Sequence, residues 1–218
     1  RYKLITARMT LNHTSGLPNW RYCSCQELNI GFMPGTQYSY SGEGFEYLGI
    51  VVKHLTGRKL QDIIQDYVFT PFSINNSYLI KNEYVEKHLA DGYKDNKEWG
   101  KNCSYTRPHV AFSLYTEAKE YAKFAIALMR ESTEPNSIFQ KMASPQLEIE
   151  PQKFVCLGIF MEQTPFGIKY YHEGSTNNRF NSNFEFYKDS QIGYVYFMNC
   201  HKGTDFKKRL NEYLINGK

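Results

Sequence analysis

Hydroxyl-bearing side chains gather in segment 38–44 (YSYSGEG), directly ahead of a predicted helix. A turn of this composition projects Tyr40 and Ser41 at the start of the helix, where the positive end of the helix dipole favours an anionic phenolate or an anionic substrate group. Both residues are therefore candidates for proton transfer or for binding. The alternative is a structural role for Tyr40, because the chain contains 18 tyrosines.

Segment 171–175 (YHEGS) closes a predicted strand and offers a second set of candidates. His172 titrates near neutral pH, which suits proton transfer. Gly174 at a strand edge lets a second backbone or a substrate approach closely, and it leaves the next N–H, that of Ser175, free to donate. The alternative is that His172 is an ordinary strand histidine.

Tyr40 and His172 complement each other chemically. A tyrosine has an unperturbed pKa of about 10, so it is a useful base near neutral pH only if cationic neighbours lower that pKa. His172 can supply part of this field, and we therefore expect the two side chains to share a cleft. If His172 supplies the charge, activity should depend on pH between about 5 and 8.

Segment 12–18 (NHTSGLP) is a predicted helix end that runs into a turn. Ser15 lies close to His13 in the sequence, which suggests an activated nucleophile. Residues so near in sequence rarely place their side chains within hydrogen-bond reach of each other, however. We favour a turn in which Thr14 and Ser15 bond local backbone groups.

The composition is that of an ordinary folded chain of 218 residues, with 41% hydrophobic and 22% charged residues. The 26 basic and 22 acidic residues give a net charge of +4 and are scattered, unlike the concentrated basic stripe of a nucleic-acid binder. No apolar run approaches the ~20 residues that span a bilayer, and no leader-like segment opens the chain. Binding to nucleic acid and a membrane span are therefore not expected.

The chain has five cysteines with irregular spacing, which is too few for a disulfide framework at this length. Cys23 and Cys25 are separated by one residue, and no matching pair of Cys or His follows them, so free thiols are favoured over a zinc site. No metal and no cofactor is expected.

Helical patterns dominate the first part of the chain, and strand patterns dominate the last part. Apolar spacing and capping residues predict helices over residues 6–12, 44–56, 60–68 and 116–129 and from Thr204 onward. Aromatic and β-branched segments predict antiparallel strands over residues 154–161, 168–172, 180–187 and 192–199. The polar stretch 82–108 is predicted to form turns.

This order of elements predicts an α+β fold rather than an alternating parallel one. Residues 1–150 are expected to form a mainly helical region, and residues 151–218 the antiparallel strands and C-terminal helix of the same catalytic domain. A sheet covered by a single terminal helix would leave its second face open. We therefore expect part of the fold to precede Arg1.

Taken together, these segments resemble the serine β-lactamase and penicillin-binding-protein-like family, in its branch of β-lactamase-related hydrolases and esterases. Residues 5–18 look like the family's "hTSGLP" helix end, and residues 38–57 like its Tyr-Ser-Asn loop and following helix. Residues 111–116 resemble the turn before its long helix, without the glycines of that turn. Residues 172–175 look like the strand with its Lys/His-x-Gly motif, and the resemblance extends in the right order over residues 5–215.

The resemblance implies a β-lactamase/transpeptidase-like fold and acyl transfer, in which the serine of a Ser-x-x-Lys motif attacks a carbonyl carbon. By this resemblance Tyr40 is the proton-transfer residue, His172 its electrostatic partner and the N–H of Ser175 an oxyanion donor. Such a donor is worth roughly 3 kcal/mol in comparable sites. The implied substrate-binding positions are Ser41, Gly42 and Gly174.

Two departures from the family pattern matter. Gly42 stands where the family usually has Asn, which favours esterase or peptidase chemistry over true β-lactamase activity. No serine of this chain is followed three residues later by lysine, and the nearest spacing, Ser137 to Lys141, lies after the tyrosine loop. The nucleophile is therefore expected upstream, and this chain alone is expected to be inactive.

The expected partners are a small ester, peptide or β-lactam-like substrate and an N-terminal segment or chain that completes the fold. The resemblance also suggests export to the periplasm or cell envelope. Two alternatives remain at this point. A non-catalytic binding or sensing module would keep the fold, whereas an unrelated α+β protein would hold Tyr40 and His172 far apart.

Overall fold

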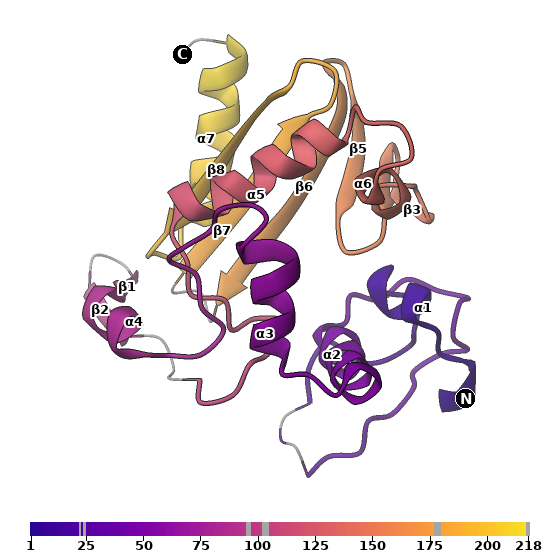
Figure 1. Ribbon diagram of the computed structural model, residues 1–218. Coiled ribbons are helices and arrows are strands. Elements are labelled where there is room, and N and C mark those ends of the chain that lie inside the picture. The colour runs from indigo at the N-terminus through magenta and orange to yellow at the C-terminus, as the bar shows by residue number, and fades with distance from the viewer. Residues whose placement is uncertain (22, 24, 95–96, 102–104, 177–179, 217–218) are drawn as a thin grey trace.

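The computed structural model describes residues 1–21, 23, 25–94, 97–101, 105–176 and 180–216 (Figure 1). The helices are η1 (Tyr2–Leu4), α1 (Ala7–Leu11), α2 (Gly42–Thr56), α3 (Leu60–Ile64) with its π-helical continuation η2 (Gln65–Phe69), α4 (Glu83–His88), α5 (Ala118–Glu131), α6 (Ile138–Met142) and α7 (Gly203–Asn216). The strands are β1 (Asp91–Lys94), β2 (Lys97–Lys101), β3 (Leu147–Glu150), β4 (Lys153–Val155), β5 (Phe160–Thr164), β6 (Gly167–Thr176), β7 (Phe180–Tyr187) and β8 (Ile192–Met198).

The main sheet has six strands in the order β3-β4-β5-β6-β7-β8, so each strand pairs with its neighbour in sequence. All of these pairs are antiparallel. A separate two-stranded sheet joins β1 and β2. Helices that precede a meandering antiparallel sheet confirm the predicted α+β fold.

Helices α5 and α7 pack on opposite faces of the sheet. Side chains alternate between the two faces along a strand, so Phe184 and Glu185 of β7 point in opposite directions. The ring of Phe184 contacts that of Tyr121 on α5, with centroids 5.6 Å apart. Glu185 lies 3.6 Å from the ammonium group of Lys207 on α7. Figure 1 shows α5 lying across the strands.

The expectation that one sheet face would lack a cover was wrong for β7 and β8, because α5 packs there. The apolar stripe of α5 supplies Leu128 to a core that also contains Phe139 of α6, Ile159 and Phe186. The part of the same face around His172 is different, because it borders a large cleft.

Helix α2 confirms the pattern predicted for residues 44–56 and begins two residues earlier than expected. The Ser41 hydroxyl caps it by accepting a hydrogen bond of 2.8 Å from the N–H of Gly44. Gly57 ends it in the left-handed conformation, with φ of 64°. Thr6 caps α1 as predicted, through the N–H of Met9.

Other boundaries differ from the prediction. Glu117, rather than Thr116, is the N-cap of α5, and the Thr116 hydroxyl bonds that of Ser77 instead, at 2.7 Å. Helix α7 begins at Gly203, so Thr204 lies inside it. The apolar run predicted as one strand over residues 154–161 is divided into β4 and β5.

Gly158 explains why that strand divides. Its φ of 80° lies in the left-handed region that glycine adopts readily, and it turns the chain between β4 and β5. The hydrogen bond from the N–H of Cys156 to the carbonyl of Ile159, at 2.8 Å, holds this turn. A second bond from the N–H of Gly158 to the carbonyl of Leu11, at 2.9 Å, ties the turn to the end of α1.

Short polar elements were missed. The stretch 82–108, predicted as turns, contains α4, β1 and β2, and the sequence patterns also did not indicate α6 or β3. Strand β1 pairs with its neighbour β2 and also contacts a distant segment, because the N–H of Tyr93 donates to the carbonyl of Asn199 at 2.7 Å.

Cys23 and Cys25 form a disulfide, which corrects the prediction that they are free thiols. Their Cα atoms are 5.3 Å apart, which is within the range that a disulfide bridges. Cys156 and Cys200 are free, and Cys103 lies outside the described residues.

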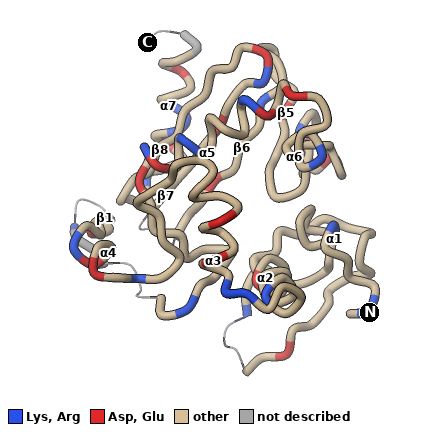
Figure 2. Tube along the Cα trace, in the orientation of Figure 1, with Lys and Arg blue, Asp and Glu red and all other residues tan. Residues whose placement is uncertain are grey.

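Acidic and basic side chains are interspersed over the described elements (Figure 2). Within the part of the chain that the structure describes, no helix is both long enough and apolar enough to cross a membrane.

Candidate active site

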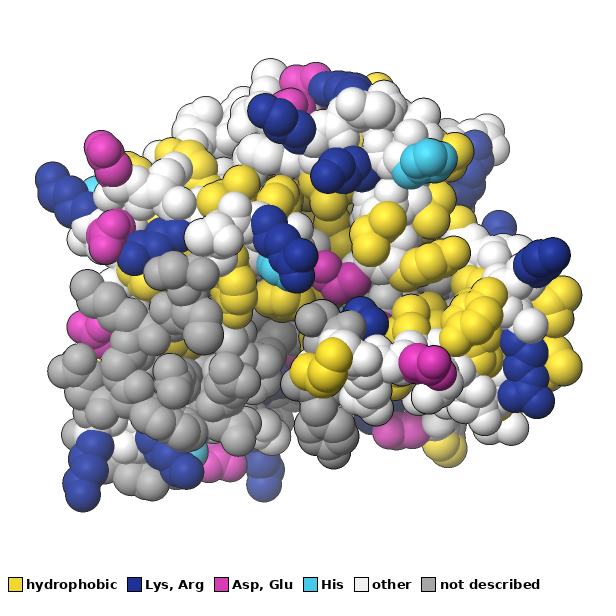
Figure 3. Space-filling view, turned by 90° about the horizontal axis from the view of Figure 1, so that it is seen from below, with side chains coloured by type: hydrophobic (Ala, Val, Ile, Leu, Met, Phe, Trp, Pro, Cys, Tyr) yellow, Lys and Arg dark blue, Asp and Glu magenta, His cyan; other side chains and the backbone are white. Residues whose placement is uncertain are grey.

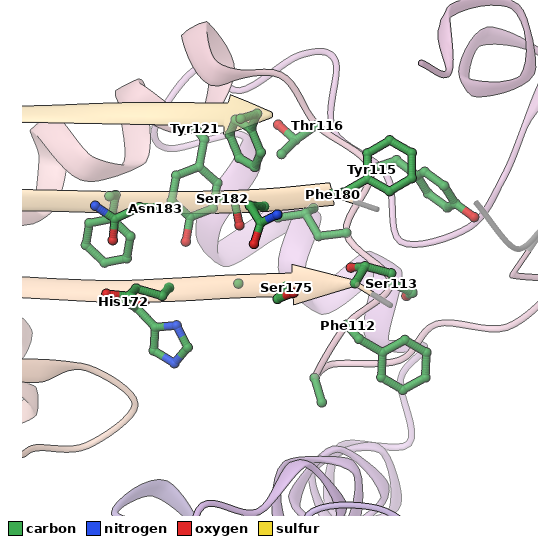
Figure 4. Close-up of a pocket in the computed structure, with 18 of the residues that line it drawn as sticks. Phe112, Ser113, Tyr115, Thr116, Tyr121, His172, Ser175, Phe180, Ser182 and Asn183 are labelled. Atoms are coloured by element: carbon green, nitrogen blue, oxygen red, sulfur yellow. The ribbon is translucent and has the colours of Figure 1, made fainter. Parts of the chain in front are cut away.

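A cleft of about 1120 Å³ lies among the sheet, α5, the start of α2 and the loop before α5. Its walls carry apolar side chains such as Phe124, Leu128 and Phe184, and its rim carries hydroxyls such as that of Ser182. In Figure 4 the ring of His172 points from β6 into this cavity, and Ser182 lies on the neighbouring strand β7.

The structure brings Tyr40 and His172 together at this cleft. Their ring centroids are 6.3 Å apart, although Tyr40 precedes α2 and His172 lies on β6. Both also line a smaller hollow of about 300 Å³ on the side of Glu150 and Lys153. This proximity contradicts the alternative in which an unrelated fold holds the two residues far apart.

Burial acts on this pair in the opposite direction to the one predicted from the sequence. It raises the pKa of Tyr40 above its usual value and lowers the pKa of His172. The backbone hydrogen bond with Glu173 and the charge of the Glu173 carboxylate only partly offset this lowering. His172 is therefore neutral at neutral pH and does not supply the positive charge that a phenolate at Tyr40 requires. The pH dependence of activity that was expected from His172 between about pH 5 and 8 therefore shifts to lower pH.

A third ring, that of His13, completes the site, and the sequence did not indicate its role. His13 is 2% exposed, and its ring lies 4.2 Å from that of Tyr40, with an angle of 30° between the planes. Its Nδ1 accepts a hydrogen bond of 3.1 Å from the N–H of Ser41, and its carbonyl accepts one of 2.9 Å from the N–H of Ser39. His13 therefore fixes both the backbone and the ring of the tyrosine loop.

The charge state of His13 follows from this environment. Burial, followed by the neighbouring His172, lowers the pKa of His13 to about 4. The unprotonated Nδ1 that accepts from Ser41 is thus the stable form at neutral pH. The sequence could not show the contacts of His13, because its partners Tyr40 and Ser41 are 25 or more residues away in the chain.

The interpretation of residues 12–18 as a turn is supported for Ser15. Its hydroxyl is fully buried and accepts a hydrogen bond of 3.3 Å from the N–H of Leu17. The Thr14 hydroxyl bonds the side chain of Asn12 at 2.7 Å, rather than a backbone group.

Ser41 and Gly42, the implied substrate-binding positions, lie at the start of α2. Ser41 is fully buried, and its hydroxyl donates to the carbonyl of Pro18 at 2.8 Å while capping α2. Its position is that of a helix cap. Gly42 lines the cleft but lies beneath the indole ring of Trp20, which occupies the space that a side chain at this position would take.

Gly174 and Ser175 are exposed at the mouth of the cleft. Strand β5 accompanies β6 only as far as Tyr171, whereas β7 pairs with β6 up to Thr176. Residues 172–176 are therefore paired on one side only among the described strands. Such an edge can accept an extended ligand by adding backbone hydrogen bonds.

Glu173 lies on the other face of β6 from His172 and forms an ion pair with Lys207 of α7. It therefore belongs to the contact between the sheet and α7. No group of three or more His, Cys, Asp or Glu side chains that could hold a metal ion occurs in the part of the chain described.

Solved structures share this arrangement of elements. The crystal structure of a beta-lactamase/D-alanine carboxypeptidase from Pseudomonas syringae superposes with a TM-score of 0.81 and 15% identity, over 97% of this chain and 71% of that one. The D-amino acid amidase of Ochrobactrum anthropi SV3, complexed with L-phenylalanine amide, gives a TM-score of 0.74 and 16% identity, over 98% of this chain and 72% of that one. The fold is thus β-lactamase/transpeptidase-like.

The beta-lactamase family model matches residues 1–216, and the chain belongs to that family. A curated relative, the D-aminopeptidase of Brucella ovis, is 24% identical over 117 residues, which cover 53% of this chain and 22% of that protein. The match thus spans about a fifth of the length of that relative. The resemblance stated from the sequence motifs is confirmed at the level of the family and the fold.

Proposed function

We propose that this chain is a portion of a serine hydrolase that acts by acyl transfer on an ester or amide. The observation that carries this proposal is the meeting of Tyr40 and His172, with ring centroids 6.3 Å apart, at a cleft bordered by the open edge of β6. Membership of the beta-lactamase family supports it, since that family consists of serine hydrolases.

In this reaction the oxygen of a serine attacks the carbonyl carbon, and its proton passes to the Tyr40 phenolate. Tyr40 then returns the proton to the nitrogen or oxygen of the leaving group as the bond from that atom to the carbonyl carbon breaks. Water hydrolyses the resulting acyl-enzyme by the reverse proton route. The N–H of Ser175 donates to the oxyanion, and Gly174 lets the substrate lie close to β6.

The nucleophile is proposed to come from a Ser-x-x-Lys segment upstream of this chain, in the same polypeptide or in a separate one. The lysine of that motif would also answer an electrostatic need. Because burial leaves His172 neutral and raises the pKa of Tyr40, another cation must stabilise the phenolate. The cleft, with its apolar wall at Leu128 and Phe184, offers space for such a segment.

The proposed substrates are amides or esters of amino acids and small peptides. The D-aminopeptidase and D-amino acid amidase relatives support this class. A β-lactam is a weaker candidate, because Gly42 has no amide side chain to bind a substrate carbonyl. We also propose that the protein is exported, as penicillin-binding proteins and many β-lactamases are.

A fluorescent fluorophosphonate probe tests this function on the full-length protein. We expect one labelled serine, located in a Ser-x-x-Lys motif, and at least a hundredfold slower labelling in the Tyr40→Phe variant. The present chain alone should remain unlabelled. If the full-length protein shows no labelled serine, or if Tyr40→Phe labels as fast as the wild type, the proposal is wrong.

A non-catalytic binding or sensing module is the second candidate. It is favoured by Glu173 and Gly42, which both depart from the commoner patterns of the family. Such a protein would bind a β-lactam or a peptide amide reversibly, without a covalent product. Mass spectrometry of the full-length protein after incubation with penicillin separates the two candidates, because only the enzyme gains the mass of an acyl group.

A further inference from the structure

The indole ring of Trp20 takes the place of a side chain at the start of α2. A Cβ atom added to Gly42 would lie 2.3 Å from Cη2 of Trp20, so the ring fills this position. Trp20 is 47% exposed and lines the same cleft as Tyr40. The indole ring of Trp20 therefore covers Gly42, which follows the proposed proton-transfer residue Tyr40 by two positions in the sequence.

The segment that carries Trp20 is firmly bound to the start of α2. The side-chain amide oxygen of Asn19 accepts from the N–H of Gly42 at 3.1 Å, and its carbonyl accepts from the N–H of Glu43 at 3.0 Å. On the other side of Trp20, the guanidinium of Arg21 donates to both carboxylate oxygens of Glu43, at 3.0 Å each. Bonds on both sides of Trp20 hold its backbone in place.

Phe112 forms the second wall and is held by the same helix. One carboxylate oxygen of Glu46 accepts from the N–H of Ala111 at 3.0 Å, and the other lies 2.8 Å from Nδ1 of His109. The ring of His109 stacks on that of Phe112, with centroids 4.4 Å apart. Figure 4 shows Phe112 on the loop near the end of β6, where Ser175 lies.

The two rings meet at a right angle. The centroids of Trp20 and Phe112 are 5.3 Å apart, with 82° between their planes. The two perpendicular rings form a corner that presents one ring face and one ring edge. A third aromatic ring can pack into this corner, because aromatic rings prefer edge-to-face and offset-stacked contacts. Figure 3 shows hydrophobic side chains gathered on the underside of the molecule. Tyr105, which also lines the cleft, adds a further aromatic ring beside Phe112, with centroids 5.2 Å apart.

We propose that Trp20 and Phe112 form a specificity pocket for an aromatic side chain of the substrate. The proposal rests on the proposed hydrolase function and names its substrate class: amides or esters whose acyl part carries a phenyl or similar ring. Glu43 and Glu46, one turn apart on α2, keep the pocket in register with Tyr40. At position 42, where the family usually has an Asn amide that binds the substrate, this chain thus offers the apolar ring of Trp20.

Catalysis by the full-length protein provides the first test. Values of kcat/KM are measured for phenylalanine amide and alanine amide, each as both enantiomers. Trp20→Ala and Phe112→Ala should each lower the value for phenylalanine amide about tenfold and that for alanine amide less than about twofold. Trp20→Phe should restore most of the difference. Phe166→Ala, at an exposed aromatic residue outside the cleft, is the matched control.

Binding to the full-length protein, with its labelled serine replaced by alanine, provides a second test that needs no nucleophile. Phe replaces Trp99 and every tryptophan outside residues 1–218, so that Trp20 is the sole indole fluorophore. Phenylacetamide should change the Trp20 fluorescence at concentrations at least tenfold lower than acetamide, and Phe112→Ala should abolish this preference.

The outcomes separate the two proposals. A full-length protein without a labelled serine, in which phenylacetamide still binds at Trp20, would overturn the hydrolase and leave the aromatic pocket standing. An active enzyme whose Trp20→Ala and Phe112→Ala variants lose activity equally toward both amides would overturn the pocket. Equal binding of phenylacetamide and acetamide by the serine-free full-length protein would overturn it as well.

Discussion

The ring of His13 lies against the ring of Tyr40, with centroids 4.2 Å apart, while its Nδ1 accepts the N–H of Ser41 at 3.1 Å. One buried side chain thus holds both the ring that is proposed to transfer a proton and the backbone of the residue that caps α2. His13 itself has a φ of 57°, in the left-handed region that few non-glycine residues adopt. Its conformation is therefore set by the surrounding contacts.

Replacing His13 should destabilise the fold. His13→Ala removes the stacked ring and leaves the buried N–H of Ser41 without its acceptor, so we expect a loss of about 2–4 kcal/mol in the free energy of unfolding. His13→Asn should lose about half as much, because Asn tolerates the left-handed conformation and its amide oxygen can accept from Ser41. Urea unfolding of the chain measures both. Equal stability of His13→Ala and the wild type would show that the contact contributes nothing.

Stability should depend on pH through the same residue. His13 has a pKa of about 4 in the folded state and about 6.5 when unfolded, so the unfolded state binds more protons between these values. Stability is then complete above about pH 6.5 and declines as the pH falls toward 4, by on the order of 3 kcal/mol. The pKa of His172 is also lowered, so it adds a decline of the same sign.

Variants separate the two contributions. Unfolding free energies measured from pH 7.5 to 4 should fall less steeply for His13→Asn than for the wild type, and less steeply again when His172→Asn is added. A His13→Asn profile parallel to that of the wild type would contradict the assignment.

Two glycines of the sheet should respond differently to substitution by alanine. A Cβ at Gly193 would lie 2.5 Å from the carbonyl oxygen of Glu185 and 2.6 Å from Cβ of Phe186, which are parts of the neighbouring strand that cannot move freely. We expect Gly193→Ala to cost about 2–4 kcal/mol.

At Gly174 a Cβ would meet only the hydroxyl of Ser182, at 2.5 Å, and that hydroxyl can rotate away. Gly174→Ala should therefore change stability by less than about 1 kcal/mol, while it slows labelling of the full-length protein because the edge of β6 becomes obstructed. Thermal unfolding and probe labelling, measured side by side, test this contrast. A strongly destabilised Gly174→Ala variant would show that the sheet cannot accommodate a Cβ atom at this position by rotation of the Ser182 hydroxyl.

Glu120 is a buried carboxylate that joins α5 to the loop after η2. It accepts from the N–H of Asn75 at 2.6 Å and lies 2.6 Å from the ammonium group of Lys123. Glu120→Ala leaves these donors unpaired and should cost about 3–5 kcal/mol. Glu120→Gln keeps an acceptor and should cost less. Chemical denaturation of both variants gives the answer, and a neutral effect of Glu120→Ala would exclude a structural role.

The sequence predicted elements with strong periodicity and their own caps. Helix α2 has an apolar face, a serine at its start and Gly57 at its end, and β7 is rich in aromatic residues, so local pattern and final structure agree. The short elements β1, β2 and α6 are too brief to show a periodic pattern, although Ser137 caps α6 by accepting from the N–H of Gln140. Strands β1 and β2 pair with each other, so their polar composition rather than a distant partner concealed them in the sequence.

The candidate site was predicted in part. Tyr40 and His172 were found because motif order placed them, but the sequence could not show that burial would leave His172 neutral. His13 was considered only as a partner for Ser15, although its contacts are with Tyr40 and Ser41. Trp20 was missed entirely, since its role depends on a glycine more than twenty residues away.

Strand β8 pairs with β7 on one side, and no described strand pairs along its other side. A row of backbone donors and acceptors on an unprotected margin attracts any extended chain, including a second copy of the same molecule. A preparation of this polypeptide by itself should therefore self-associate increasingly with concentration, and the addition of one short β-forming peptide in excess should keep it dispersed.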